Sequence, residues 1–187
     1  MVSDRPRMMT ITGQMSWLQG LFGGWMWSCD CTDSQQCQLN DEIWDHVVLN
    51  QATDLLVTVG WRHIVPQWVI ESCRLGVVGF HSARLPEHPG RAPVPWAILR
   101  GDATTDNTML YLTSEPDAGD IIDRRTIPVT TAREMNRRMG ETAAEMLRQH
   151  LPALLDGTAP RTPQDRSKRG PLTTADGWQR LTEAQRG

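Results

Sequence analysis

The sequence predicts an α/β fold, in which an open, mostly parallel β-sheet is flanked by helices. Residues 55–59 form a short apolar run rich in β-branched residues, which is the pattern of a parallel strand covered on both faces. Residues 77–80 give a second buried-strand pattern. After a loop punctuated by proline and glycine, residues 94–99 form an apolar helical segment. A strand, a loop and a helix in this order are typical of an α/β sheet.

The N-terminal elements are less regular. Residues 8–11 predict a first strand, residues 15–22 a short helix, and residues 42–50 another short helix with its apolar positions on one face. We therefore expect a minimal βα unit ahead of the strand at 55–59. Pro66 suits the first turn of the helix that follows this strand, because a proline there gives up only an N–H group that has no helical partner.

The C-terminal elements have clearer signals. Residues 108–112 and 121–129 predict two more strands, and a capping box beginning at Thr131 starts a long helix. Five apolar residues of that helix fall on one face, which we expect to be core: Met135, Met139, Ala143, Met146 and Leu147. A kink or restart is expected at Pro152, and the helix should end at Gly157.

Composition restricts the function classes. A chain of 187 residues that is 39% hydrophobic can bury one sizeable core and needs no second domain. Its net charge of −3 differs from the strongly basic character of general nucleic-acid binders. No apolar run approaches the roughly 20 residues of a membrane span, and no basic region followed by an apolar core opens the chain. The sequence therefore predicts a cytoplasmic protein with neither a span nor a secretory signal.

Shifts in composition divide the chain into three parts. Residues 1–41 form an atypical N-terminal segment rich in tryptophan and glycine, residues 42–157 the folded core, and residues 158–187 a proline-rich polar tail. We expect the tail to be an extended arm or a disordered segment, because it has too few apolar residues for a core of its own.

Three clustered cysteines raise the question of a metal site. Cys29, Cys31 and Cys37 could supply three of the four ligands of zinc. Their spacing differs from the usual C-x-x-C pairs, however, and no histidine lies at the spacing of a zinc finger. We predict reduced thiols and no metal.

His81 is the first candidate site residue. It ends the strand at 77–80, and ligands of open α/β sheets bind outside the carboxyl ends of the strands. A lone histidine at a strand end is more often a hydrogen-bonded structural residue. A functional role for His81 gains support because Gly60 closes the preceding strand and Asp117 follows in the loop SEPDAGDII.

Three blocks in this order resemble a known family. They are DLLVTVGW from Asp54, HSARLPEHPGRAPVPWAI from His81 and DAGD from Asp117. They are similar to the formyltransferase family that uses N10-formyltetrahydrofolate, which includes methionyl-tRNA, glycinamide ribonucleotide and sugar N-formyltransferases. The resemblance covers residues 54–165 and implies a Rossmann-like, formyltransferase-like fold. This fold would be trimmed at the N-terminus, since too few residues precede position 55 to build the family's two βα units well.

The resemblance also implies a chemistry and a site. Formyl transfer to an amine passes through a tetrahedral intermediate bearing an oxyanion, while the amine loses a proton and the leaving nitrogen gains one. By resemblance, His81 donates to the oxyanion, and Asp117 favours the protonated imidazole and relays protons. The residues assigned in the same way to the cosubstrate N10-formyltetrahydrofolate are Arg62, Ile64, Val65, Glu115 and Asp117.

One position departs from the family. The family has an asparagine two residues before its histidine, where this chain has Gly79. Losing one oxyanion donor typically slows an enzyme by about 100- to 1000-fold. Three interpretations therefore stay open: a formyltransferase, an inactive or truncated remnant that keeps the folate-shaped pocket, and a hydrolase that releases formate from formyltetrahydrofolate.

The expected acceptor is the primary amine of a small molecule, such as an amino sugar nucleotide or an amino-acid derivative. The segment APRTPQD at residues 159–165 resembles the linker of methionyl-tRNA formyltransferases, but the β-barrel domain that helps those enzymes hold tRNA does not follow it. A tRNA substrate is therefore not expected. No membrane partner is expected, and a homodimer stays open.

Overall fold

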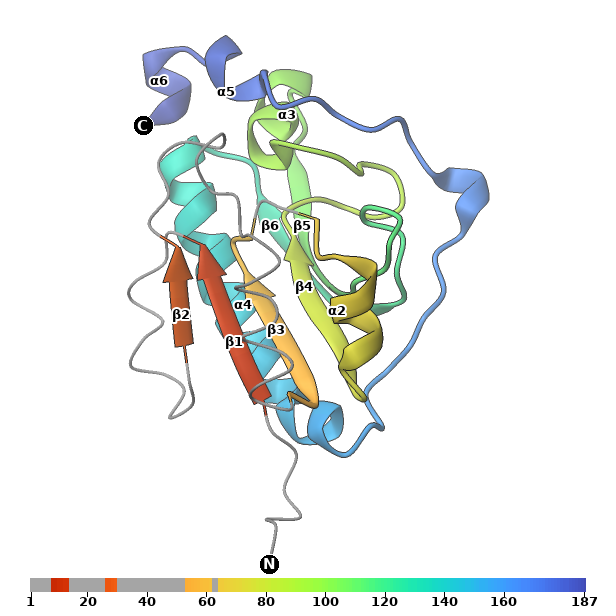
Figure 1. Ribbon diagram of the computed structural model, residues 1–187. Coiled ribbons are helices and arrows are strands. Elements are labelled where there is room, and N and C mark those ends of the chain that lie inside the picture. Colours follow the sequence, from red (N-terminus) through yellow and green to blue (C-terminus); the bar gives the residue numbers. More distant parts are fainter. Residues whose placement is uncertain (1–7, 14–25, 30–52, 62–63) are drawn as a thin grey trace, which may run out of the picture.

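The described part of the chain forms one six-stranded sheet. The computed structural model describes residues 8–13, 26–29, 53–61 and 64–187. The strands are β1 (Met8–Gly13), β2 (Met26–Cys29), β3 (Leu55–Val59), β4 (Gly76–His81), β5 (Thr104–Tyr111) and β6 (Ile121–Pro128). Their order in the sheet is β2-β1-β3-β4-β5-β6 (Figure 1). The first four strands are parallel, whereas β5 is antiparallel to both of its neighbours. The α/β prediction is confirmed, with a sheet that is mixed at one side.

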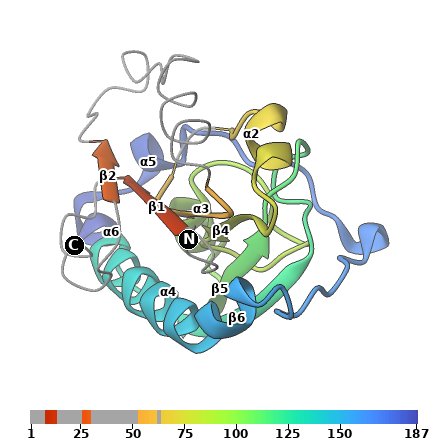
Figure 2. The same cartoon turned by 60° about the horizontal axis from the view of Figure 1, so that its bottom comes forward.

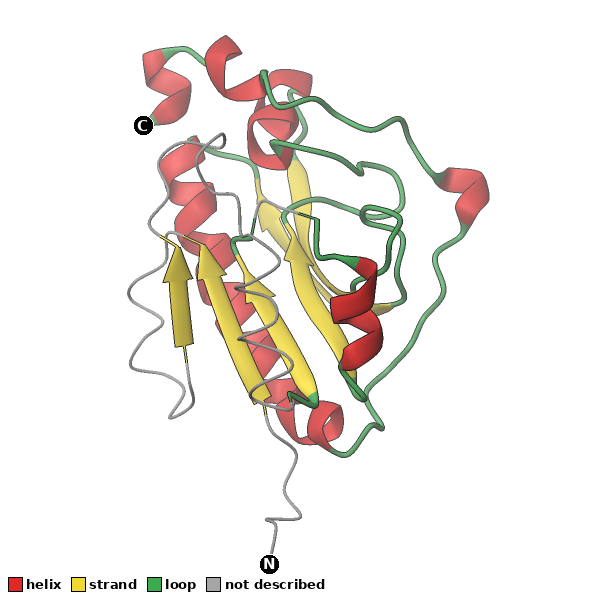
Figure 3. Cartoon of the chain, in the orientation of Figure 1, coloured by secondary structure: helices red, strands yellow, loops and turns green. Residues whose placement is uncertain are grey.

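Helices cover both faces of this sheet. They are α2 (Gln67–Ser72), α3 (Pro93–Arg100), α4 (Ala132–Leu155), α5 (Gly177–Arg180) and α6 (Glu183–Arg186), with a 3₁₀ turn at Arg166–Lys168. In the view of Figure 3, α2 lies in front of the sheet and α4 behind it, and the end-on view of Figure 2 separates the same two layers. None of the described helices has the length and hydropathy needed to cross a membrane. The helices predicted at 15–22 and 42–50 lie outside the described residues.

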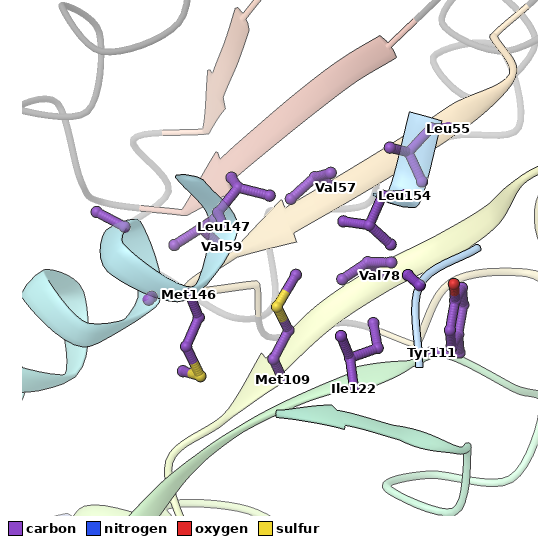
Figure 4. Packing of buried hydrophobic residues seen from close by; sticks show 13 residues of the cluster. Leu55, Val57, Val59, Val78, Met109, Tyr111, Ile122, Met146, Leu147 and Leu154 are labelled. Carbon is purple, nitrogen blue, oxygen red and sulfur yellow. The ribbon is translucent and has the colours of Figure 1, made fainter. Parts of the chain in front are cut away.

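The core follows from the alternation of side chains along each strand. In β3, Leu55, Val57 and Val59 pack towards α4, whereas Leu56 packs with Val69 of α2 on the opposite face. The five residues predicted as the buried stripe of the long helix are all buried. Figure 4 shows Met146 and Leu147 of that stripe packed against β3, β4 and β5.

The helix α4 runs through Pro152 without a restart. It continues as one helix to Leu155. Pro152 lies in the last turn, so it removes a single helical hydrogen bond, the one to the carbonyl of Arg148, and Leu154, only 1% exposed, fixes that turn in the core. Gly157 then ends the helix with a φ of 72°, as predicted.

Residues 158–187, here called the arm, lie against the core. In Figure 1 the arm leaves the lower end of α4, passes outside the loops that follow β4 and β5, and reaches α3. Trp96 of α3 donates a hydrogen bond to the carbonyl of Thr174, and Leu181 is buried among residues of α3 and α4. The C-terminal half of the arm is therefore held against α3 and α4.

Candidate active site

The structure brings the two predicted catalytic side chains together. His81 is the last residue of β4 and is 7% exposed. Its Nδ1 lies 3.3 Å from Oδ1 of Asp117, and its Nε2 lies 2.8 Å from the carbonyl oxygen of His88. Both facing atoms are hydrogen-bond acceptors, so each ring nitrogen has a partner to which it can donate. A substrate oxygen that approaches Nε2 must displace the carbonyl of His88.

Asp117 reaches His81 by a route that the sequence did not suggest. We expected the loop after the strand at 108–112 to bring Asp117 to the edge of the sheet where His81 lies, and it does so. Because β5 is antiparallel to β4, this loop begins farther back, where the N–H of Leu112 donates to the carbonyl of Val77. Residues 112–120 then fold back to His81 and return to Asp120, whose carbonyl accepts from the N–H of Tyr111. The two side chains meet through this loop rather than through neighbouring strand ends.

The backbone of this loop has little freedom. Asp117 has a left-handed φ of 54°, which aspartate tolerates better than most residues. Its Oδ2 accepts a 2.8 Å hydrogen bond from the N–H of Gly90. A Cβ at Gly119 would lie 1.8 Å from the carbonyl oxygen of Tyr111, so only glycine fits there. The carboxylate of Asp117 is thereby fixed on both oxygens.

The loop that follows His81 is held by β5 and β6. Thr108 donates to the carbonyl of Ala83 at 2.8 Å, and Arg124 donates to the carbonyl of Leu85. The residue Arg124 is exposed, and this contact ties its side chain to the loop. Arg84 forms a 3.0 Å ion pair with Asp106.

The carboxyl group of Asp106 is tuned by its partners. Burial alone would raise its pKa, but the hydrogen bonds from Arg84 and Thr126, together with the charge of Arg84, outweigh burial and lower the pKa. The carboxylate is therefore the favoured form in the folded protein, and it ties the loop after β4 to the sheet.

The space beside Gly79 is already filled. A Cβ at this position would lie 2.8 Å from Cδ2 of Leu112 and 2.9 Å from Oγ1 of Thr58. The amide of Asn107, on the neighbouring strand β5, does not replace the missing side chain. It is 1% exposed, and its Nδ2 donates to Met139 and Thr142 on the side of α4.

The residues predicted to contact the cosubstrate are placed differently from one another. Ile64 is 67% exposed, whereas Val65 is 3% exposed and packs with Leu56 and Val69. Arg62 lies outside the described residues. Glu115 faces two arginines of the arm, at 2.8 Å from Arg166 and 3.5 Å from Arg169.

Sequence reasoning missed the contribution of the arm. Nε2 of Gln164 donates to the carbonyls of Asp117 and Gly119, and the guanidinium of Arg169 donates to the carbonyls of Pro116 and Asp117. The segment APRTPQD stood out only as similar to a linker, since a polar, proline-rich composition does not reveal which loop it will bind. The described residues contain no cluster of three potential metal ligands.

Comparison with known proteins gives a consistent result. A family model described as formyl transferase matches residues 28–154. The methionyl-tRNA formyltransferase of Listeria monocytogenes is 39% identical over 118 residues, which are 62% of this chain and 38% of that protein. That of Latilactobacillus sakei is 30% identical over 115 residues, which are 60% of this chain and 36% of that protein. The chain thus spans well under half the length of these relatives.

Two solved structures share the fold. The formyltransferase PseJ from Anoxybacillus kamchatkensis, in complex with UDP-4,6-dideoxy-4-formamido-L-AltNAc and tetrahydrofolate, has a TM-score of 0.70 and 21% identity. The match covers 96% of this chain and 94% of PseJ. HypX from Aquifex aeolicus, in complex with tetrahydrofolic acid, has a TM-score of 0.73 and 17% identity over 96% of this chain and 32% of HypX.

Proposed function

The chain belongs to the formyl transferase family, and from this premise we propose that it moves a formyl group from N10-formyltetrahydrofolate to the primary amine of a small molecule. The observation that supports this most is the pairing of His81 with Asp117 at the carboxyl end of β4. It places a proton donor and a carboxylate next to each other where an open α/β sheet binds ligands.

The two side chains have complementary tasks in this reaction. The amine nitrogen forms a bond to the formyl carbon, the bond from that carbon to N10 breaks, the amine loses one proton and N10 gains one. His81 stabilises the oxyanion that develops on the formyl oxygen by donating its Nε2–H to this oxygen, which takes the place of the His88 carbonyl. Asp117 holds the Nδ1 side of the ring, and its negative charge stabilises a positive charge on the imidazole.

The proposed folate contacts differ in kind. Ile64 offers an exposed apolar side chain to the pterin ring, whereas Val65, whose side chain is buried, can contribute only its main chain. Glu115 would meet the cosubstrate with a carboxylate that Arg166 and Arg169 already hold. Arg62 completes the proposed set. An apolar surface beside converging polar groups is the usual composition of a small-molecule site, so these residues fit a folate.

Gly79 favours a second candidate function. With Leu112 and Thr58 filling the space beside it, no side-chain amide reaches the oxyanion position from this strand residue. The loss of one donor costs roughly 100- to 1000-fold in rate. A protein that binds the folate but turns over slowly or not at all is therefore the alternative.

The acceptor is proposed to be a small molecule. A chain with a net charge of −3 does not offer the basic surface that usually binds nucleic acid. PseJ, whose structure contains a formamido nucleotide sugar, matches over nearly its whole length and suggests amino sugar nucleotides as first acceptors to test. The relatives named methionyl-tRNA formyltransferases make methionyl-tRNA the necessary comparison.

One set of assays tests the proposal. We expect 5-formyltetrahydrofolate, a stable analogue of the cosubstrate, to raise the stability by about 2.7 kcal/mol at 100 times its Kd, measured by thermal shift. Formyl transfer from N10-formyltetrahydrofolate is then assayed with amino sugar nucleotides, amino acids and methionyl-tRNA, and formate is measured without any amine. Formate release without an amine would identify a hydrolase. Binding without either reaction would favour the slow or inactive binding protein, and no binding to the folded chain would contradict the proposal.

A further inference from the structure

We propose that Gln164 is a positioning residue for Asp117, supported by Arg169, so that the arm is a working part of the active site rather than a linker. This inference rests on the proposed function for its kinetic test, although its structural test is independent of turnover. The geometry involves three segments: the loop after β4, the loop after β5, and the arm between Gln164 and Thr173.

Gln164 fixes the main chain on which Asp117 sits. Its Nε2 donates 2.9 and 2.7 Å hydrogen bonds to the carbonyl oxygens of Asp117 and Gly119. Both hydrogens of one amide group are thus used on one short turn. Within the described part of the chain the buried Oε1 of Gln164 has no hydrogen-bond partner. A flipped amide would place this oxygen against two carbonyl oxygens, so the observed orientation is the only one that bonds the turn.

Arg169 supports the same turn from its other side. Its guanidinium donates to the carbonyls of Pro116, at 2.7 Å, and Asp117, at 3.3 Å, and its side chain is 19% exposed. Pro116 has no N–H of its own to anchor the turn. Donors of the arm therefore bond three carbonyls of residues 116–119, and the carbonyl of Asp117 accepts from both side chains.

The turn needs such support because it must hold the carboxylate of Asp117 in one orientation. Asp117 has a left-handed backbone, with a φ of 54°, and its carboxylate must face His81 with one oxygen and the N–H of Gly90 with the other. A rotation of the peptide after Asp117 would break both of its carbonyl contacts and release the backbone that positions the carboxylate against the imidazole. Gln164 opposes this rotation without touching the reacting atoms.

The arm itself stays in place when one of these side chains is changed. Thr173 exchanges backbone hydrogen bonds with Pro89 and Arg91, and the N–H of Gly170 donates to the carbonyl of Pro86. A Cβ at Gly90 would lie 2.2 Å from the nitrogen of Thr173, which shows how closely the two segments pack. Substitution of Gln164 thus removes the support of the turn and leaves the course of the arm intact.

The first test follows the imidazole itself. We expect the ¹⁵N NMR signals of the His81 ring at pH 7, assigned by their loss in His81→Asn, to move in Gln164→Leu and in Gln164→Glu. Glutamate has the shape of glutamine but no N–H donor, so a side chain that only fills space would tolerate it. Gln149→Leu is the matched control, since Gln149 on α4 accepts from Arg125 of β6 rather than from the turn. Unchanged His81 signals in both Gln164 variants would overturn the inference.

The second test uses turnover. Gln164→Leu should lower kcat about 100-fold, the cost of displacing a catalytic group by roughly 1 Å, with KM for the formyl donor changed less than threefold. In Asp117→Asn the same substitution should have no further effect, because Gln164 acts through Asp117. If the losses of kcat in Gln164→Leu and Asp117→Asn multiply in the double variant, the positioning role is contradicted. If Gln164→Leu fails to fold, Gln164→Glu and Arg169→Gln are measured instead. Moved His81 signals in a protein without turnover would sink the proposed function and leave the positioning role standing.

Discussion

His81 and Asp117 are held at one end of the candidate site by contacts from two loops and the arm, whereas the other end, the turn after β3, leaves Ile64 67% exposed. Both lie at the carboxyl edge of neighbouring parallel strands. The end with His81 and Asp117, here called the braced end, contains the groups that take part in proton transfer, for which distance and direction decide the rate. The end with Ile64, here called the open end, offers apolar surface, which contributes binding affinity without requiring a fixed geometry.

The largest effect is expected at the braced end. His81→Ala should lower turnover by about 100- to 1000-fold, because it removes the oxyanion donor. Binding of 5-formyltetrahydrofolate should be nearly unchanged, and the two are measured by single-turnover kinetics and calorimetry. His150→Ala is a matched control, since His150 on α4 pairs with Asp123 away from the site. Normal turnover in His81→Ala would contradict the assignment of His81.

Gly79 gives the second largest expected effect and tests whether the braced end lacks a donor. Gly79→Asn alone should destabilise the protein, because Leu112 and Thr58 occupy its space. Combined with Leu112→Ala, which removes the nearest atom, the asparagine should raise turnover by about 10- to 100-fold through a restored donor. The pair Gly79→Ala and Leu112→Ala fills the space without a donor. Equal rates in the two double variants would show that the missing amide does not limit catalysis.

Asp106 tests the attachment of the loop after β4 rather than the chemistry. The folded pKa of Asp106 lies below its unfolded value, so its contribution to stability is present above the unfolded pKa and is lost as the pH falls through the folded pKa. Asp106→Asn should therefore lower the free energy of unfolding by about 1–3 kcal/mol at pH 7, and by less below about pH 4. Urea titrations at the two pH values measure this. Asp156→Asn at the exposed end of α4 is the control, and an equal loss at both pH values would contradict the expectation.

Some parts of the fold and of the candidate site could be predicted from the sequence, and others could not. The strand at 55–59 and the methionine stripe of α4 were predictable, because buried periodic side chains determine both. His81 and Asp117 were found through a family motif. The antiparallel direction of β5 and the hydrogen bonds of Gln164 were not predictable, since they depend on contacts between residues far apart in the chain. A single polar residue such as Gln164 leaves no periodic signal, even where its amide holds a turn.

The smallest effect is expected at the open end. Ile64→Ala should weaken the binding of 5-formyltetrahydrofolate by about three- to tenfold, because partial burial of the lost carbons is worth roughly 1 kcal/mol. The rate of formyl transfer at saturating donor should stay the same, since no proton-transfer group changes. Val65→Ala is the contrasting variant: Val65 is buried beside Leu56 and Val69, so it should lower the stability more than the affinity. Calorimetry and thermal unfolding separate the two. A loss of rate in Ile64→Ala without a loss of affinity would mean that this end, too, must hold a fixed geometry for the reaction.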